Sequence, residues 1–240
     1  MVKNMPHSVD RSMPPCRVLG IFVGKTKTLT DARGDWQSSI ARDRVEGPAH
    51  LELRGFVGDQ ATQSYHGSPD IAVCLHSQTH YDFWNATLQM DLQPGGVGEN
   101  LTLDTWDDSN LCVGDKLRIG TALIQISAPR SPCENQARFV GRPDWVKRTL
   151  QELRTGIYAR VLEPGSMLPG DEVILIERPN PGLTIRDLND CWYHHFDVVF
   201  AKLYSDAEGL MEWWKQRFGD KVVEAYQVSG SNGAPSAHPG

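Results

Sequence analysis

The stretch that most constrains this chain is 121–133, with the sequence TALIQISAPRSPC. It begins with the apolar residues of a strand, and we expect Pro129 and Pro132 to stop that strand, because proline donates no backbone hydrogen bond and fixes its own φ. The stiff exit presents Arg130 and Cys133, a guanidinium and a thiol that suit an anionic ligand and a soft metal. Alternatively, Cys133 is an inert small apolar residue, as most intracellular cysteines are.

Size, charge and cysteine usage limit the classes of protein that fit. The chain has 240 residues, 40% of them hydrophobic, which is enough for one main domain and a small appendage. Its net charge of −6 and its lack of a basic stripe predict no nucleic-acid polymer as partner. No apolar run approaches the roughly 20 residues of a membrane helix. The first residues lack the apolar centre of a signal peptide, and five scattered cysteines do not form a disulfide framework. We therefore expect a cytoplasmic protein with free thiols, not bound to a membrane.

Paired glycine and aspartate residues mark the turns of a β-rich domain. Gly114-Asp115 and Gly170-Asp171 each precede a short apolar strand, and a glycine with positive φ opens a hairpin. Many short β runs of this kind predict a closed or partly closed β-barrel over about 17–178. Strands are expected at 18–23, 49–53, 71–75, 101–103, 116–119, 157–162 and 173–176, whereas 25–47 is expected to be mainly loop.

Helical patterns occur at two places within this region. Ser77 is a good N-cap for a helix at 78–88. A second helix is expected at 144–154, with one face formed by Val146, Leu150 and Leu153.

The character of the chain changes after about residue 182. Thr184 with Asp187, and Ser205 with Glu208, each have the spacing of a capping box, so 183–226 is expected to hold about three short helices. Residues 1–16 are expected to be a loose arm and 229–240 a disordered tail. The core of the helical segment is expected to be Leu210, Trp213, Trp214 and Phe218.

Two small groups of cysteine and histidine offer zinc binding as an alternative. A structural zinc site needs four ligands in paired sets, and neither group supplies a second pair. The groups are Cys191 with His194 and His195, and Cys74 with His76 and His80.

Six short motifs follow one another along the chain: HGSPD at 66–70, GVGENLT at 96–102, VGD at 113–115, PRSPC at 129–133, GIYARVLEPG at 156–165 and PGDEV at 169–173. Their order resembles that of MOSC domains, the family named for its relation to the C-terminal domain of molybdenum-cofactor sulfurase. The helical segment resembles the three-helix appendage of the YiiM-like branch, whose members are linked to resistance against N-hydroxylated purines. The resemblance covers about 17–226 and implies a mainly β fold with some helix, a barrel like the small one of pyruvate kinase.

The resemblance also implies a cofactor, the molybdenum cofactor (molybdopterin), with Cys133 as catalytic residue and thiolate ligand of the metal. A terminal phosphate on the pterin favours guanidinium donors, and Arg130 and Arg160 either bind it or form ordinary ion pairs. The residues that the resemblance implies for cofactor binding are His66, Gly67, Asp70, Glu99, Asn100, Arg130, Tyr158 and Arg160.

Several of these side chains have a structural alternative. His66 either contacts the pterin or a metal-bound oxygen, or it fixes its own loop. Asn100 either contacts the pterin or supplies a turn conformation. Asp70 and Glu99 are expected to orient loops through backbone N–H groups rather than to transfer protons.

The chain departs from the family pattern at three positions. Ser68 replaces a glycine, Ile71 stands where a basic residue is common, and Asn135 stands where related chains often carry lysine. These changes indicate either a shifted substrate or a site that has lost its cofactor.

The leading hypothesis is a molybdenum-dependent oxidoreductase that removes the oxygen from small N-hydroxylated compounds. The chain has no clustered cysteines for an iron–sulfur centre and no GxGxxG motif, so electrons are expected from a separate flavoprotein or ferredoxin. The second hypothesis is a carrier module without turnover, which holds the cofactor or a persulfide on Cys133. A homodimer is compatible with either.

Overall fold

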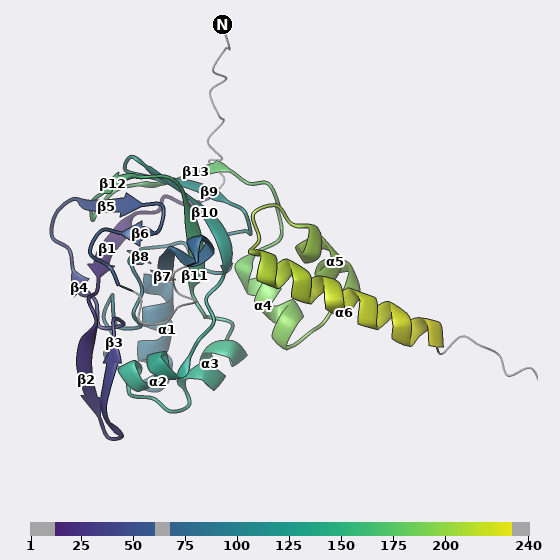
Figure 1. Ribbon diagram of the computed structural model, residues 1–240, viewed down its shortest axis with the longest axis horizontal. Helices are drawn as coiled ribbons and strands as arrows, with labels where there is room; N and C mark the ends of the chain where they lie inside the picture. Colours follow the sequence, from purple (N-terminus) through teal and green to yellow (C-terminus); the bar gives the residue numbers. More distant parts are fainter. Residues whose placement is uncertain (1–12, 61–67, 232–240) are drawn as a thin grey trace, which may run out of the picture.

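An eight-stranded sheet curls around the core of this protein, whose computed structural model describes residues 13–60 and 68–231. The strand order is β13-β9-β10-β11-β7-β8-β1-β4, and all neighbours are antiparallel except β7 and β8 (Figure 1). The strands are β1 (Val18–Val23), β4 (Asp43–Arg44), β7 (Val73–Ser77), β8 (Leu101–Leu103), β9 (Lys116–Ile119), β10 (Ala122–Pro129), β11 (Ile157–Glu163) and β13 (Val173–Glu177).

The start of β1 meets the start of β13, so the sheet curls nearly into a barrel. The N–H of Val18 donates to the carbonyl of Asp171 at 3.0 Å, and the N–H of Val173 donates to that of Cys16 at 2.8 Å. The expected β-barrel is confirmed. The loose arm expected at 1–16 is wrong at its end, because Cys16 is fully buried and Pro14 accepts a hydrogen bond from Trp106.

The predicted glycine–aspartate turns are present, and each aspartate stabilises its own turn. Gly114 has φ 82° and Gly170 has φ 93°. The Asp115 carboxylate accepts from the N–H of Cys112 at 2.9 Å. The Asp171 carboxylate accepts from the N–H three residues earlier in the same way, at 2.8 Å.

Two smaller β elements flank the curled sheet. One is the sheet β12 (Gly165–Met167), β5 (Ala49–Glu52) and β6 (Gly55–Phe56), and the other is the hairpin of β2 (Lys27–Asp31) and β3 (Gly34–Ser38). The expectation of a loop at 25–47 is therefore wrong. The hairpin was missed because its strands are only half-buried and carry few apolar residues, which weakens the period-two signal.

Three helices border the barrel: α1 (Gln78–Leu88), α2 (Glu134–Val140) and α3 (Trp145–Gln151). The Ser77 cap is confirmed by a 3.2 Å bond from the N–H of Thr79 to its hydroxyl. Helix α2 was not predicted. The expected face of the helix at 144–154 is right only in part. Val146 packs half-buried against the core and Leu153 is buried, but Leu153 lies beyond the end of α3, whose fully buried residues are Trp145 and Thr149.

The last three helices, α4 (Ile185–Tyr193), α5 (Val198–Asp206) and α6 (Glu212–Ser231), confirm the predicted helical segment. The cap at Thr184 is confirmed by a bond of 3.0 Å from the N–H of Asp187. The second capping box is wrong, because Ser205 lies inside α5, which Asp197 caps instead. Helix α6 also continues to Ser231, beyond the start of the expected tail.

These helices share the core of the barrel although α6 points away from it (Figure 1). Ile185, Tyr204 and Phe218 are fully buried and belong to the same apolar cluster as the strands. A Cβ atom on Gly209 would lie 2.7 Å from the Cα of Gly114, so the two backbones approach closely. In the part of the chain that the structure describes, no helix combines the length and the apolarity that crossing a bilayer requires.

Two aromatic residues of α6 test this packing. Phe218 is fully buried, whereas Trp213, which was expected in the core, is 47% exposed. We expect Phe218→Ala to lower the unfolding free energy by about 3–5 kcal/mol, because it leaves a cavity in the shared core. Trp213→Ala should change it by less than about 1 kcal/mol. Urea denaturation measures both, and equal losses would contradict the assignment of the two faces.

Candidate functional site

A cavity of about 110 Å³ lies where β10 ends and α2 begins, against the segment 38–60 and the loop before β8. The polar and sulfur-containing side chains along it come from five separate parts of the chain. They are Ser38, Ser39, Arg42, Arg54, Asp59, Gln60, Cys74, Asn100, Arg130, Ser131, Cys133, Asn135 and Tyr158.

The end of β10 delivers two of these side chains. Pro129 stops the strand as predicted and is its last residue, opposite Ile157 of β11. Its missing N–H costs no ladder bond, because the other neighbour, β9, pairs only as far as Gln125. Arg130 then bonds the carbonyl of Gly156 through its own N–H at 2.8 Å.

The guanidinium of Arg130 is buried and only partly satisfied. The residue is 7% exposed, and Nη2 donates to the carbonyl of Gly98 at 3.3 Å. Its Nη1 has no hydrogen-bond partner among the described residues. A buried donor without a partner is unfavourable, so this atom is suited to binding an anionic or carbonyl oxygen.

Cys133 is half-buried at the N-cap position of α2. Its side chain accepts no capping hydrogen bond from the helix, so the sulfur remains available to the cavity. The other four cysteines, Cys16, Cys74, Cys112 and Cys191, are buried, and the pKa of each of their thiols is raised by desolvation. Cys133 is therefore the accessible thiol among the cysteines of the chain.

Arg42 and Asp59 form a second wall, which the sequence analysis did not anticipate. Arg42 binds the Asp59 carboxylate through Nε and Nη2, both at 3.0 Å. Its Nη1 donates to the carbonyl of Gly98 at 2.7 Å. Asp59 follows Gly58, whose φ is 89°, so the signal that could have found this residue is one more glycine–aspartate pair in the sequence.

Asn100 lines the cavity and also holds its frame together. Its Oδ1 accepts from the N–H of Cys74 at 3.1 Å, and its Nδ2 donates to the carbonyl of Phe22 at 3.2 Å and to Asp59 at 3.0 Å. The amide therefore joins β1, β7 and the Asp59 turn.

Glu99 lies behind the cavity and orients its loop, as predicted. It is fully buried, and its Oε1 accepts from the hydroxyl groups of Tyr81 and Thr102, each at 2.6 Å, and from the N–H of Gly95 at 2.7 Å. Desolvation and the adjacent carboxylate raise the pKa of Tyr81, so this hydroxyl keeps its proton.

Asp70 and Arg160 form an ion pair outside the residues that line the cavity. Their Nε–Oδ1 distance is 2.8 Å, and Arg160 also donates to Gln125 at 2.8 Å. This ion pair corresponds to the structural alternative for Arg160, whereas the Asp70 carboxylate binds a side chain rather than the backbone N–H groups that were expected. A role of either residue in cofactor binding stays a prediction. His66 and Gly67 lie outside the described residues.

The three departures from the family pattern have different surroundings. Ser68 caps a 3-10 turn at Pro69–Ile71, so the strand predicted to begin at residue 71 begins at Val73 instead. Ile71 and Asn135 line the cavity, where they give an apolar and a neutral amide surface.

Neither proposed zinc group has the geometry of a metal site. Among residues 13–60 and 68–231, no three histidine, cysteine or acidic side chains are arranged to hold an ion. His194 contacts the carbonyl of Leu150 at 2.8 Å, and the Cys191 thiol donates to that of Asp197 at 3.6 Å.

A second buried polar cluster lies behind Arg130. A Cβ atom on Gly156 would lie 3.0 Å from His76 Nδ1 and 3.7 Å from Arg130 Cδ. The His76 and His80 rings are 4.8 Å apart, and His80 Nε2 lies 3.9 Å from carboxylate oxygens of both Asp107 and Asp108. Burial raises the pKa of Asp108 to about 7 and lowers that of His76 to about 4.

Together these observations define a class of protein: a small curled β-barrel with an attached helical segment, which presents an accessible thiol and a buried guanidinium at one cavity. The MOSC domain model matches residues 62–174. The protein YflK of Bacillus subtilis (strain 168) is 34% identical over 207 residues, which make up 85% of this chain and 93% of that protein. The chain therefore belongs to the MOSC domain family.

A solved structure and a fungal relative extend the comparison. The crystal structure of YiiM from Geobacillus stearothermophilus has a TM-score of 0.74 and 29% identity, and the match covers 87% of this chain and 100% of that one. A Gibberella moniliformis protein named Reductase is 35% identical over 152 residues, which make up 62% of this chain but only 27% of that protein.

The buried histidine next to the cavity gives a pH prediction. Folded His76 stays neutral down to about pH 4, whereas the unfolded chain takes up a proton below about 6.5. The unfolding free energy should therefore contain a loss of about 2 kcal/mol between pH 7 and pH 5 that His76→Leu removes. Denaturant titrations at the two pH values measure the difference. The exposed His50→Leu is the control, and identical slopes for wild type and His76→Leu would refute the prediction.

Proposed function

We propose that this protein binds the molybdenum cofactor through Cys133 and reduces small N-hydroxylated compounds with electrons from a separate redox protein. The observation that carries the proposal is the pairing, in one cavity, of the accessible Cys133 thiol with the buried Arg130 guanidinium. A thiolate is the soft ligand that such a metal accepts, and a guanidinium is suited to a phosphate or to a polarised oxygen.

The residues around the cavity fit the cofactor. Cys133 would ligate the metal, Arg130 would bind an anionic oxygen through Nη1, and Tyr158 supplies a further polar group. Asn100 would hold the frame around the cofactor, because both N–H groups of its amide already donate to Phe22 and Asp59. Gly98 allows the loop before β8 to pack closely against Ile40, because a Cβ atom at this position would lie 2.2 Å from the Ile40 side chain. When bound, the cofactor supplies the two-electron chemistry that no protein side chain offers.

The protein's own side chains have binding and orienting roles in this proposal. Conversion of R–NHOH to R–NH₂ and water consumes two electrons and two protons. Desolvation raises the pKa of Tyr158, so its hydroxyl keeps its proton near neutral pH and can donate a hydrogen bond to a polar ligand. Arg42, held by Asp59, fixes the opposite wall and the Gly98 carbonyl.

The electron source in this proposal follows from the sequence. The chain carries no clustered cysteines for an iron–sulfur centre and no dinucleotide fingerprint. Electrons would therefore come from a separate redox protein.

Cys133→Ser tests the proposal most directly. The variant should fold as the wild type does, because the side chain is half-buried at a helix start. Its turnover of an N-hydroxylated substrate should fall by at least roughly 100-fold, because a hydroxyl stays protonated and is a harder ligand. The measurement is molybdenum content together with turnover supported by a chemical reductant, in protein from a host that makes the cofactor.

Cys191→Ser, on α4 away from the cavity, is the matched control and should keep both metal and turnover per folded molecule. Equal turnover in wild type and Cys133→Ser would end the thiolate assignment. Molybdenum in the wild type without any turnover would support the carrier module instead.

A further inference from the structure

The β2–β3 hairpin contacts the helix that begins at Cys133, although it lies outside the matched residues 62–174. Arg138 of α2 binds Asp31 of β2 through two hydrogen bonds, Nε to Oδ2 at 2.6 Å and Nη2 to Oδ1 at 2.9 Å. The same guanidinium lies 4.5 Å from the centre of the Trp36 ring on β3. Such a bidentate, stacked contact fixes both distance and orientation.

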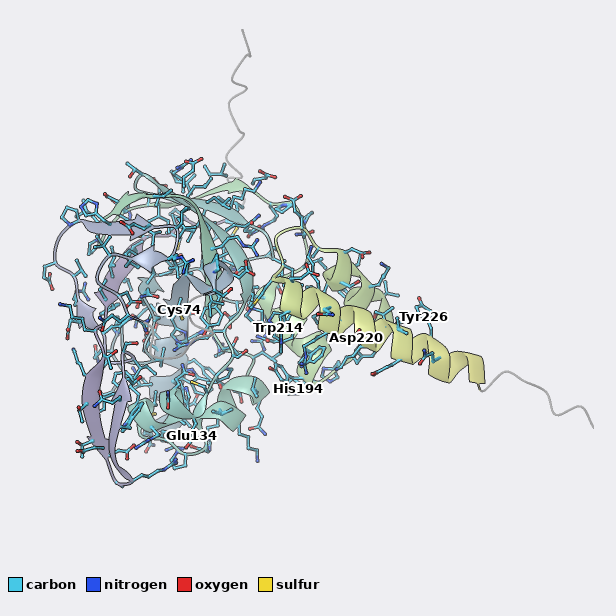
Figure 2. The ribbon with its side chains drawn as sticks, in the orientation of Figure 1. Cys74, Glu134, His194, Trp214, Asp220 and Tyr226 are labelled. Carbon is cyan, nitrogen blue, oxygen red and sulfur yellow. The ribbon has the colours of Figure 1, made fainter. Side chains whose placement is uncertain are left out.

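A second ion pair joins the two elements close to the thiol. Arg33, in the turn of the hairpin, pairs with Glu134, the residue after Cys133. Glu134 marks the start of α2 in Figure 2, and the hairpin lies beside this helix in Figure 1. Two of the seven residues of α2 are therefore tied to the hairpin.

The hairpin also continues directly into the opposite side of the cavity. Strand β3 ends at Ser38, and Ser38 to Ile40 and Arg42 line the cavity. Ser131, Cys133 and Asn135 line it from the α2 side. One hairpin thus connects the two walls between which the thiol lies.

Helix α2 depends on such contacts for its position. A helix of seven residues is unstable by itself, so tertiary contacts decide where it lies. On its inner side Ala137 is buried and Gln136 donates to the carbonyl of Val97 at 3.3 Å. The ion pairs that the structure shows on its outer side, at Glu134 and Arg138, both go to the hairpin.

We propose that the β2–β3 hairpin is a positioning element for the cavity, and that Arg138, clasped by Asp31 and Trp36, is the positioning residue that holds Cys133 in place. The proposal rests on the proposed function only for the role of Cys133 as a ligand. The accessibility of the thiol can be measured without any metal, so the two proposals fail separately.

The test is the rate at which iodoacetamide alkylates Cys133 in the full-length, metal-free chain, followed by intact mass. Cys16, Cys112 and Cys191 are buried and do not line the cavity, so they report any general loosening of the fold, whereas Cys74 lines the cavity together with Cys133. Asp31→Asn and Arg138→Met should each raise the rate roughly tenfold, the change that corresponds to about 1.4 kcal/mol of lost closing free energy.

The two variants separate positioning from electrostatics. Asp31→Asn removes a negative charge and Arg138→Met removes a positive one, so a field effect on the thiol would move the two rates in opposite directions. Loss of the Asp31–Arg138 contact as a positional constraint would instead raise both alkylation rates. The double variant should be no faster than either single variant, because both remove the same interaction.

Asp43→Asn is the matched control. It breaks the Lys27–Asp43 ion pair at the other end of β2, which does not reach α2, and it should leave the rate unchanged. Arg33→Met, at an exposed turn, should raise the rate by a smaller factor without loss of fold. Three results would each overturn the proposal. The alkylation rates of Asp31→Asn, Arg138→Met and Arg33→Met could all equal that of the wild type. The rates of Asp31→Asn and Arg138→Met could shift in opposite directions, or their effects could multiply in the double variant.

Discussion

The carbonyl oxygen of Gly98 joins the parts of the chain that form the cavity. It accepts one hydrogen bond from Arg42 at 2.7 Å and another from Arg130 at 3.3 Å. Two guanidinium groups that share one buried carbonyl oxygen need negative charge nearby to offset their positive charges. The Asp59 carboxylate supplies it for Arg42, from which it accepts two further hydrogen bonds. Arg130 lines the cavity, and its Nη1 has no hydrogen-bond partner among the described residues, so its charge is only partly compensated. The Gly98 carbonyl therefore links the backbone of the barrel to the two arginine side chains that line the cavity.

The same residues that build the cavity also hold the barrel together. Asn100 bonds the backbones of β1 and β7, and Glu99 gathers three donors behind the loop. The Asn100 amide is fully bonded, whereas Oε2 of the buried Glu99 has no hydrogen-bond partner among the described residues. The bonded part of such a network restricts where the neighbouring side chains can lie. Cys133 is not positioned by this network within the barrel. It lies at the start of the short helix α2, which the β2–β3 hairpin holds from outside the barrel. The site therefore combines a rigid half, in the barrel, with a half whose position depends on ion pairs at the surface.

Local chemistry made some features predictable and others not. Ser77 and Thr184 cap helices through contacts within three residues, and the Gly-Asp turns close on themselves, so a short stretch contains the whole cause. Ser205 has the same spacing as a cap but lies inside α5, because the packing of Tyr204 and Ala201 decided where that helix runs. Trp213 has core spacing and still faces solvent, since α6 presents only one side to the barrel.

By itself the sequence determined the strand and turn pattern of the barrel, the helical character of its last part, and the motifs that mark Cys133 and Arg130. The tertiary structure alone decided which residues meet them. Arg42 reaches Gly98 across 56 positions and Asn100 reaches Asp59 across 41, and no local pattern encodes such contacts. Asp70 and Arg160, which the motifs also marked, pair with each other away from the cavity. Side chains far apart in sequence come together only when the sheet curls, because the strand register sets which of them share a face.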